Sequence, residues 1–444
     1  MFEGFDKLSV IERQDAFLDQ WVSAEGIEFA GEENRAAYKE RAGLVASALK
    51  IDQDIKRVPI MPLTTFAPTM LAGVSGREAM YDPEKAGQAY LDFCNIYQPD
   101  TAGAAPMLGC GQALDTLKYN LYKWPGNGVA ENLSYQFHEK EYMKADEYDH
   151  LISDPTDFWL RSWVPKTMGA LAPLADMQPI YGSMELPMLS SWLISLGTPP
   201  MQEALQALLK AGKQYFDWIN ALGAYMAQIM AAGFPFGAGG ATKAPFDTLS
   251  DSFRGTTPLM MDMYRRPEKV LEAVERLVPA MIKNGVDGAV ANGNPLVFIP
   301  LHKGADGFMS DEQFEKFYWP TLKKVMYGLA EAGCVPCCFV EGGYNQRLQY
   351  LTDTADIRSM YLFDRTDMAK AREVLGGKVC IAGGFPISLI LTGTPEQVRE
   401  ETKKLLDVAA GDKGYMLSIG CAMDEAKDAT LRAFIEAGKE YGKY

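Results

Sequence analysis

Three side chains that could bind a metal ion stand in strand-like runs of the C-terminal half of the chain. Glu341 follows the apolar run VPCCFV, Cys380 lies in KVCIAGG, and Cys421 follows YMLSIG. Zinc accepts carboxylate and thiolate ligands, and a catalytic zinc site keeps one position open, so one Glu with two Cys would suffice. The three residues are far apart in sequence, and we expect them to converge only if their strands are neighbours.

Side-chain alternation predicts how two of these residues meet. In an extended strand every second side chain points to the same face. If both faces point inward, Glu341 and Cys421 approach each other where the strands end. The expected inward faces are Val335, Cys337, Phe339 and Glu341 on one strand, and Tyr415, Leu417, Ile419 and Cys421 on the other.

Candidates for proton transfer and substrate binding stand at the same and neighbouring strand ends. His302, one of only three histidines, follows the run LVFIPL, and its imidazole could act as a general acid, a hydrogen-bond partner or a ligand. Tyr344 is the second candidate proton donor. Asp364, Phe339 and the Phe308–Met309 pair are predicted to contact the substrate.

Eight strand-like runs separated by amphipathic helices would position these residues. The first two cover residues 57–66 and 98–104, the third ends near Ala244, and the others end near Leu301, Glu341, Asp364, Gly383 and Gly420. Alternating strands and helices predict a closed parallel (β/α)8 TIM barrel, in which the chemistry lies at the C-terminal ends of the strands. No glycine-rich phosphate-binding motif follows any run, which disfavours an open nucleotide-binding sheet.

The remaining segments are predicted to be helical and to belong to one barrel domain that spans residues 1–444. Residues 1–50 would form a helical cap, and a helix would start at Pro83 with Asp82 as its N-cap. Residues 105–233, rich in Met and aromatic side chains, would form a long helical insertion after the second strand. Either it shapes substrate access at the ligand face, or it is a plain helical subdomain.

Composition excludes several classes of function. A formal net charge of −15 without clustered Lys or Arg argues against binding nucleic acid or anionic membrane. No apolar run reaches the roughly 20 residues that span a bilayer, and the N-terminus lacks a signal-peptide layout. Seven cysteines do not resemble a disulfide framework, so we expect free thiols in the cytoplasm.

Several phrases resemble the uroporphyrinogen decarboxylase superfamily, in the order in which that superfamily carries them. They are RVPI, APFDTLSDSFRG before DMYRRPEKV, GFMSDEQFEKFYWP, AGGFP and GTPEQV. The superfamily contains true decarboxylases and cobamide-dependent methyltransferases. The chain has TTFAPTM where decarboxylases carry an arginine-rich motif for an octa-acidic tetrapyrrole, so it is more similar to the methyltransferase branch.

Methyltransferases of this superfamily bind zinc through an H-x-C pair and a late Cys. Cys421 looks similar to the late Cys, whereas the H-x-C pair falls on Phe339 and Glu341, and Cys380 could restore a third ligand. The phrases WPGNG, KADEYDHLISDP and FVEGGYNQRL resemble the O-demethylase branch. That resemblance implies methyl transfer from a methoxylated aromatic compound to the cobalamin of a separate corrinoid protein, with zinc acting on the leaving oxygen.

Two other functions stay open from the sequence. One is a metal-free decarboxylase that acts on a smaller substrate, and the other is a non-catalytic subunit that binds a corrinoid partner. The identity of the methyl donor and the direction of transfer are not fixed by the residues. A homodimer also stays open, because large barrels often pair.

Overall fold

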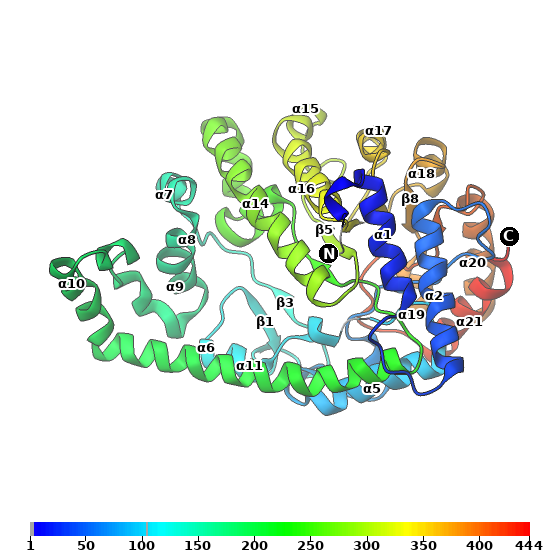
Figure 1. The fold of residues 1–444 in the computed structure, drawn as a ribbon, viewed down its shortest axis with the longest axis horizontal. Helices are drawn as coiled ribbons and strands as arrows, with labels where there is room; N and C mark the ends of the chain where they lie inside the picture. Colours follow the sequence, from blue (N-terminus) through cyan, green and yellow to red (C-terminus); the bar gives the residue numbers. More distant parts are fainter. Residues whose placement is uncertain (1–3, 104) are drawn as a thin grey trace.

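A curved sheet of six parallel strands forms the centre of the computed structural model, which describes residues 4–103 and 105–444 (Figure 1). The strands pair in sequence order from β4 to β9, as expected when each is followed by a helix that returns the chain. Their bounds are β4 Gly240–Ala241, β5 Leu296–Leu301, β6 Val335–Val340, β7 Met360–Phe363, β8 Cys380–Gly383 and β9 Tyr415–Met416.

Two further extended segments close this sheet into a ring. Ile60 forms a parallel bridge with Leu417 beside β9, and Ala102 forms one with Phe236 just before β4. The backbone N–H of Asp100 donates to the carbonyl of Ile60 over 2.9 Å, which joins the two segments. The ring therefore has the eight positions of the predicted (β/α)8 barrel, although the first two are single bridges. Residue 104, the end of the second predicted strand, lies outside the described residues.

The N-terminal helices close the bottom of the barrel, as predicted. Helices α1 (Val10–Ser23) and α2 (Glu32–Lys50) pack Leu18, Trp21 and Tyr38 against side chains from inside the ring. These interior side chains alternate with outward ones along the strands. The interior set includes Met61, Val335, Cys337, Phe339, Met360, Leu362, Cys380, Ala382 and Met416.

A layer of helices covers the outside of the ring. The predicted helix α5 (Pro83–Tyr97) begins as expected, because the Asp82 carboxylate accepts a hydrogen bond from the backbone N–H of Lys85. Figure 1 shows the later helices around the strands at the right of the view. They are α14 (Pro267–Ala291), α16 (Trp319–Glu331), α17 (Leu348–Leu351), α18 (Met368–Leu375), α19 (Ile387–Thr392), α20 (Pro395–Ala409) and α21 (Asp428–Tyr441).

The insertion between the second strand position and β4 forms an arm that extends to the left in Figure 1. It is mainly helical, as predicted, but also contains a three-stranded sheet in the order β2-β1-β3. Its last helix, α11, has 33 residues and packs along α5 and α6. The elements are α6 (Gly111–Leu117), β1 (Tyr122–Pro125), β2 (Gly128–Val129), β3 (Gln136–Phe137), α7 (Tyr148–Ser153), α8 (Pro155–Phe158), α9 (Val164–Thr167), α10 (Leu186–Gly197) and α11 (Pro199–Ala231).

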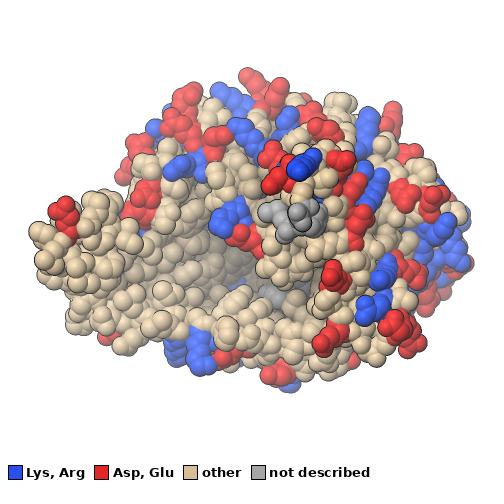
Figure 2. All heavy atoms as spheres, viewed as in Figure 1, with Lys and Arg blue, Asp and Glu red and all other residues tan. Residues whose placement is uncertain are grey.

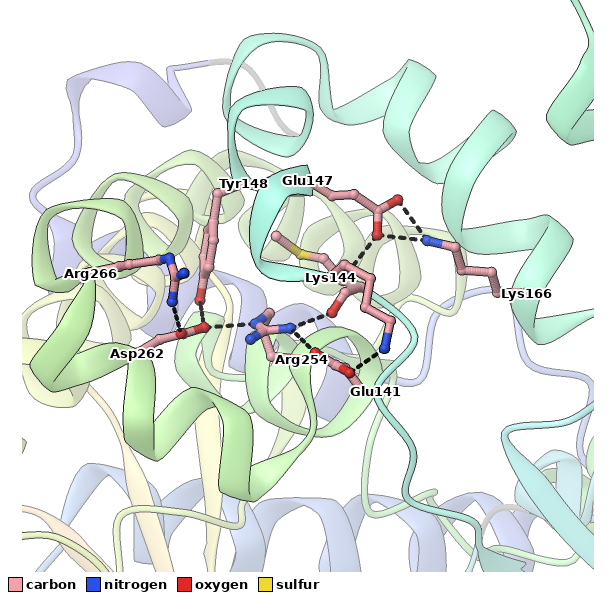
Figure 3. Close-up of polar contacts among 9 residues, drawn as sticks. Glu141, Lys144, Glu147, Tyr148, Lys166, Arg254, Asp262 and Arg266 are labelled. Atoms are coloured by element: carbon pink, nitrogen blue, oxygen red, sulfur yellow. Dashed lines mark hydrogen bonds and ion pairs between the residues drawn. The ribbon is translucent and has the colours of Figure 1, made fainter.

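A buried ion network fastens the arm to the barrel (Figure 3). Arg254 ends the π-helical segment η7 (Thr248–Arg254) that follows β4. Its Nε donates to Asp262 over 2.7 Å, and its Nη1 donates to Glu141 over 2.6 Å and to the carbonyl of Met143 over 2.5 Å. The Tyr148 hydroxyl also donates to Asp262, over 3.0 Å. One guanidinium therefore holds η7, α13 (Thr256–Arg265) and the arm together.

We predict that Arg254→Met lowers the free energy of unfolding by about 1.5–3 kcal/mol, because the buried Asp262 loses the charged hydrogen bond from Arg254 and keeps only Arg266 and the Tyr148 hydroxyl as partners. The side chains of Arg254 and Asp262 are only 4% and 3% exposed. Urea denaturation followed by circular dichroism measures the change. The matched control is Arg77→Met, which removes the ion pair between Arg77, 48% exposed, and Glu131, 68% exposed. Loss of this exposed pair should lower the free energy of unfolding by less than about 1 kcal/mol. Equal losses in both variants would contradict this role.

Candidate active site

The barrel interior contains a cavity of about 810 Å³. Phe298, Phe339 and Leu362 line it from the strands, Trp21 from the helical cap, and Met226 from helix α11 of the arm. Among its described lining residues none is Lys, Arg, His, Asp or Glu. Such a cavity favours an uncharged organic group, because an unpaired charge would lose its hydration there.

His302 and Glu341 lie at the mouth end of two strands that line this cavity, although neither is among its lining residues. Phe298 and Phe339 lie in the cavity wall on β5 and β6, with ring centroids 6.1 Å apart. His302 follows β5 and Glu341 follows β6, each on the inward face of its strand. Glu341 therefore lies about 7 Å nearer the C-terminal mouth than Phe339, and His302 lies about 13 Å nearer than Phe298. The imidazole Nε2 of His302 lies 3.5 Å from Oε1 of Glu341. The strand register thus brings these two predicted site residues together.

Two carboxylates of the η7 region hold His302 from the other side. Asp251 Oδ2 lies 2.5 Å from His302 Nδ1 and 2.6 Å from the ammonium group of Lys243. Asp247 accepts hydrogen bonds from the backbone N–H groups of His302 and Lys303, each over 3.0 Å. The Tyr318 hydroxyl donates to Asp247 over 2.7 Å. These contacts fix both the ring and the backbone of His302.

The charges around His302 favour its protonated form. Burial lowers the pKa of His302, but the hydrogen bond to Asp251 and the negative charges of Asp247, Asp251 and Glu341 outweigh it, so the pKa is raised. Burial likewise opposes ionisation of Asp251, yet the hydrogen bond from His302 and the charge of Lys243 hold the Asp251 pKa below its usual value. The pair therefore favours the protonated form of His302 and the ionised form of Asp251.

Glu341 has the opposite tendency. Burial raises the pKa of Glu341, and the nearby charges of Asp247, Asp251 and Asp364 add to this, while His302 opposes it. Its side chain is still 43% exposed, so it faces the open mouth of the barrel. The arrangement Asp251, His302, Glu341 can therefore hold a proton at His302 Nε2 and deliver it to a group above the cavity.

Tyr344 does not reach the mouth. Its side chain is fully buried and packs edge-on against Phe314, with ring centroids 6.5 Å apart. A Cβ atom on Gly304 would lie 2.2 Å from the Tyr344 hydroxyl oxygen, so glycine is required for this close approach. Burial raises the pKa of Tyr344 well above its ordinary value. The structure places Tyr344 in the packing beneath the loop, so a catalytic role for this residue stays a prediction without support from its position.

The predicted substrate-contact residues are dispersed. Phe339 lines the cavity, whereas Asp364 accepts a hydrogen bond from the backbone N–H of Gly342 over 3.0 Å and lies beside Glu341. Phe308 is half-buried, and the Lys303 ammonium lies 5.4 Å from its ring centroid. Met309 is buried, and its carbonyl accepts from Arg347 over 2.6 Å.

The predicted metal ligands do not form one set. Cys380 is level with Met360 and Cys337 in the parallel register, so it lies near the beginning of the strands. Glu341 lies four residues beyond Cys337, about 13 Å along the strand axis. Cys380 is fully buried, and burial raises its thiol pKa well above the ordinary value. Its position is that of a core residue, too far along the strand axis from Glu341 to complete the predicted zinc site.

Cys421 lies near Glu341, but not by the predicted alternation. Tyr415, Leu417 and Ile419 pack in the outer layer, and Met416 points inward instead. The strand β9 ends at Met416, and the turn after it places Cys421 at the mouth. Burial and the charges of nearby Asp364, Asp424 and Glu341 raise its thiol pKa to about 11. The thiol is therefore protonated at neutral pH.

These positions do not fit the proposed zinc ion. Across the described part of the chain, no three His, Cys, Asp or Glu side chains are grouped so that they could hold a metal. The residues present instead support proton transfer by His302, and no step below depends on a metal in this chain.

Sequence reasoning missed the residues that hold His302. Asp247 and Asp251 are four residues apart in APFDTLSDSF, which was considered only as a family phrase, and Lys243 precedes that phrase. The signal that could have found them is their place directly after the third strand, where barrel enzymes carry functional groups. The π-helical form of η7 could not be foreseen, although such segments are frequent at functional sites.

Comparison with known proteins agrees with this architecture. The family model described as Uroporphyrinogen decarboxylase (URO-D) matches residues 205–441, more than half of the chain. The chain belongs to the uroporphyrinogen decarboxylase family. A solved structure of a methyltransferase from Methanosarcina mazei superposes with a TM-score of 0.60 over 90% of this chain and 98% of that one, at 16% sequence identity.

Curated relatives of the family align with part of the chain. Methylcobamide:CoM methyltransferase MtbA of Methanosarcina acetivorans is 28% identical over 163 residues, which are 36% of this chain and 44% of the relative. The MtbA protein of Methanosarcina mazei is 25% identical over the same shares. Uroporphyrinogen decarboxylase of Saccharophagus degradans is 26% identical over 44% of this chain and 55% of the relative. The alignments thus span about half of these relatives.

We predict that His302 titrates above 6.5, the ordinary value for histidine, because Asp251 stabilises the imidazolium. NMR titration of ¹⁵N-labelled histidines measures this pKa, and His302→Gln assigns the resonance among the three histidines. Asp251→Asn should lower the pKa of His302. The control Asp157→Asn removes the carboxylate 2.6 Å from His150 and should leave the His302 titration unchanged. An unaltered pKa in Asp251→Asn would contradict the assignment.

Proposed function

We propose that this protein is a corrinoid-dependent methyltransferase that moves a methyl group from a methoxylated aromatic compound to the cob(I)alamin of a separate corrinoid protein. The observation that carries the proposal is the contact between His302 and Asp251, which favours the protonated imidazole, at the mouth end of strands that line an uncharged cavity. Removal of a methyl group from a methoxyarene requires a proton donor, because the leaving group is a phenolate that must be protonated. The alignment with methylcobamide:CoM methyltransferases supports a corrinoid partner, although in those relatives the name gives the methylcobamide as the methyl donor.

The cavity supports an aromatic donor. Its volume of about 810 Å³ lies in the range of small-molecule pockets, and the nearly parallel rings of Phe298 and Phe339 offer faces for an arene. Met226 and Met230 of α11 line the same cavity, so the arm contributes to the pocket. This favours the alternative in which the insertion shapes substrate access over the alternative of a plain helical subdomain. Met side chains adapt to ligands of irregular shape.

The reaction balances with one proton. The corrinoid supplies a cobalt(I) electron pair that forms the new bond to the methyl carbon. The bond between the methyl carbon and the aryl oxygen breaks, and its electron pair stays on the oxygen. His302 Nε2 gives its proton to that oxygen and the phenol leaves, while Asp251 keeps the imidazole oriented and Glu341 faces the same ring nitrogen.

A decarboxylase that acts on a polycarboxylated tetrapyrrole receives less support. No basic side chain is among the described residues that line the cavity, so several carboxylates would be buried without partners. A purely corrinoid-binding subunit would not need a fixed imidazolium above an apolar cavity. All seven cysteines are free thiols, which supports the cytoplasm as the place of the reaction. None of the helices in the described residues is long and apolar enough to cross a bilayer.

The test follows the absorption change from cob(I)alamin to methylcob(III)alamin, with free cobalamin and with a reduced corrinoid protein. Methoxyarenes, methylamines and methylthiols serve as donors, and we expect transfer from methoxyarenes. His302→Gln should slow transfer by about 10²–10⁴-fold, the usual contribution of a general acid. His138→Gln, a change in the arm, is the matched control and should keep the rate. Absence of methyl transfer from every donor would overturn the proposal.

A further inference from the structure

The helix α10 at the end of the arm has an unusual surface. Its sequence LPMLSSWLISLG contains no charged residue, and none of its twelve side chains is buried in the described structure. Leu186 is 83% exposed and Ile194 is 70% exposed. A helix of this length is marginal by itself in water and normally gains its stability from an apolar face that packs on something. In the isolated chain, α10 packs on residues 180–183 and on α11 only through half-buried side chains such as Trp192 and Leu196, and its other apolar side chains stay uncovered.

The exposed apolar side chains continue beyond α10. We define the arm tip as residues 180–216, which comprise η6 (Ile180–Ser183), α10 and the first half of α11. Of the 21 large apolar side chains that are exposed in the described residues, 11 lie in the arm tip. They are Ile180, Tyr181, Met184, Leu186, Met188, Leu193, Ile194, Leu208, Leu209, Tyr215 and Phe216.

The exposed apolar area is sufficient for a stable dimer. A large side chain buries about 150–250 Å² when fully covered, so eleven partly exposed ones offer on the order of 1,000 Å² per copy. A standard interface needs roughly 800 Å² from each partner, and homodimer interfaces are the more apolar class. A concentration of apolar surface this large marks an interaction site.

The charge distribution favours a second copy of this chain as the partner. The arm tip carries Glu185, Glu203, Lys210 and Lys213, so its formal charge is zero, while the whole chain carries −15. Figure 2 shows the left end of the molecule as almost entirely uncharged, with charged side chains gathered over the barrel. Two copies would therefore repel each other least where their arm tips meet. In a two-fold dimer the same surface patch of both copies meets, so the patch must be complementary to itself. A neutral apolar patch meets this condition because it does not repel its own copy.

Other partners fit less well. Interfacial membrane helices carry Lys or Arg on a polar face, and α10 has neither. A corrinoid carrier has to reach the mouth of the barrel, but Figure 1 shows α10 at the opposite end of the arm from the strands. We therefore propose that the arm tip is a homodimer interface in which α10 and the start of α11 pack against their counterparts in a second copy.

Sedimentation velocity and light scattering of the full chain test this inference. We expect a species of twice 49.0 kDa, and we expect Leu186→Glu with Ile194→Glu to give a monomer that keeps its circular dichroism spectrum and its thermal transition from the barrel. Leu209→Glu on α11 is an independent variant that should weaken the dimer. Tyr264→Glu, at a side chain that is 76% exposed on α13, is the control and should stay dimeric.

A monomeric wild type at micromolar concentration would overturn the proposal, as would a double variant that remains fully dimeric. Flotation with neutral phosphatidylcholine vesicles distinguishes a lipid surface: binding by the wild type that is lost in the double variant would also overturn it. The inference does not depend on the proposed methyl transfer.

Discussion

The hydrogen bond between Asp251 and His302 is the contact on which the site depends. It joins the segment after β4 to the end of β5, and it exists because η7 carries Asp251 back across the mouth of the barrel. Arg254, three residues later, anchors the same segment to the arm. The position of a buried guanidinium therefore determines where the carboxylate lies, and the carboxylate determines the protonation and orientation of the imidazole.

The mouth of the barrel is charged and the interior is uncharged, and the hydrogen bond between Asp251 and His302 lies on the charged side of this boundary. Charged groups gather at the strand ends, where Asp251, Lys243 and Glu341 surround His302. The space below them is lined by apolar and small polar side chains. A neutral ligand can enter that space at little desolvation cost, and any charge that develops at its upper end meets a proton donor. Under the proposed function, this arrangement would help to release a poor anionic leaving group from an apolar molecule.

The helices and strands can be predicted from local sequence patterns, whereas the candidate site can be predicted only in part. The strands, the cap of α5 at Asp82, and the inward face that ends at Glu341 are dictated by strand period and helix-end chemistry. The distance between Cys380 and Glu341 could not be predicted, because a strand-like run does not show how far along the barrel axis a residue lies. Cys421 lies near Glu341 as predicted, but the predicted alternation did not hold, because it does not continue through a turn. Asp251 was missed because its contact with His302 spans 51 residues and a π-helix.

The most direct test of the central claim is how the rate of methyl transfer depends on the leaving phenol. The rate is measured for a series of substituted anisoles with free cob(I)alamin, in the wild type and in His302→Gln. If His302 protonates the leaving oxygen, the wild-type rate will change little with the acidity of the phenol, while the variant will be slow except with the most acidic phenols. The same steep dependence in both proteins would contradict the account.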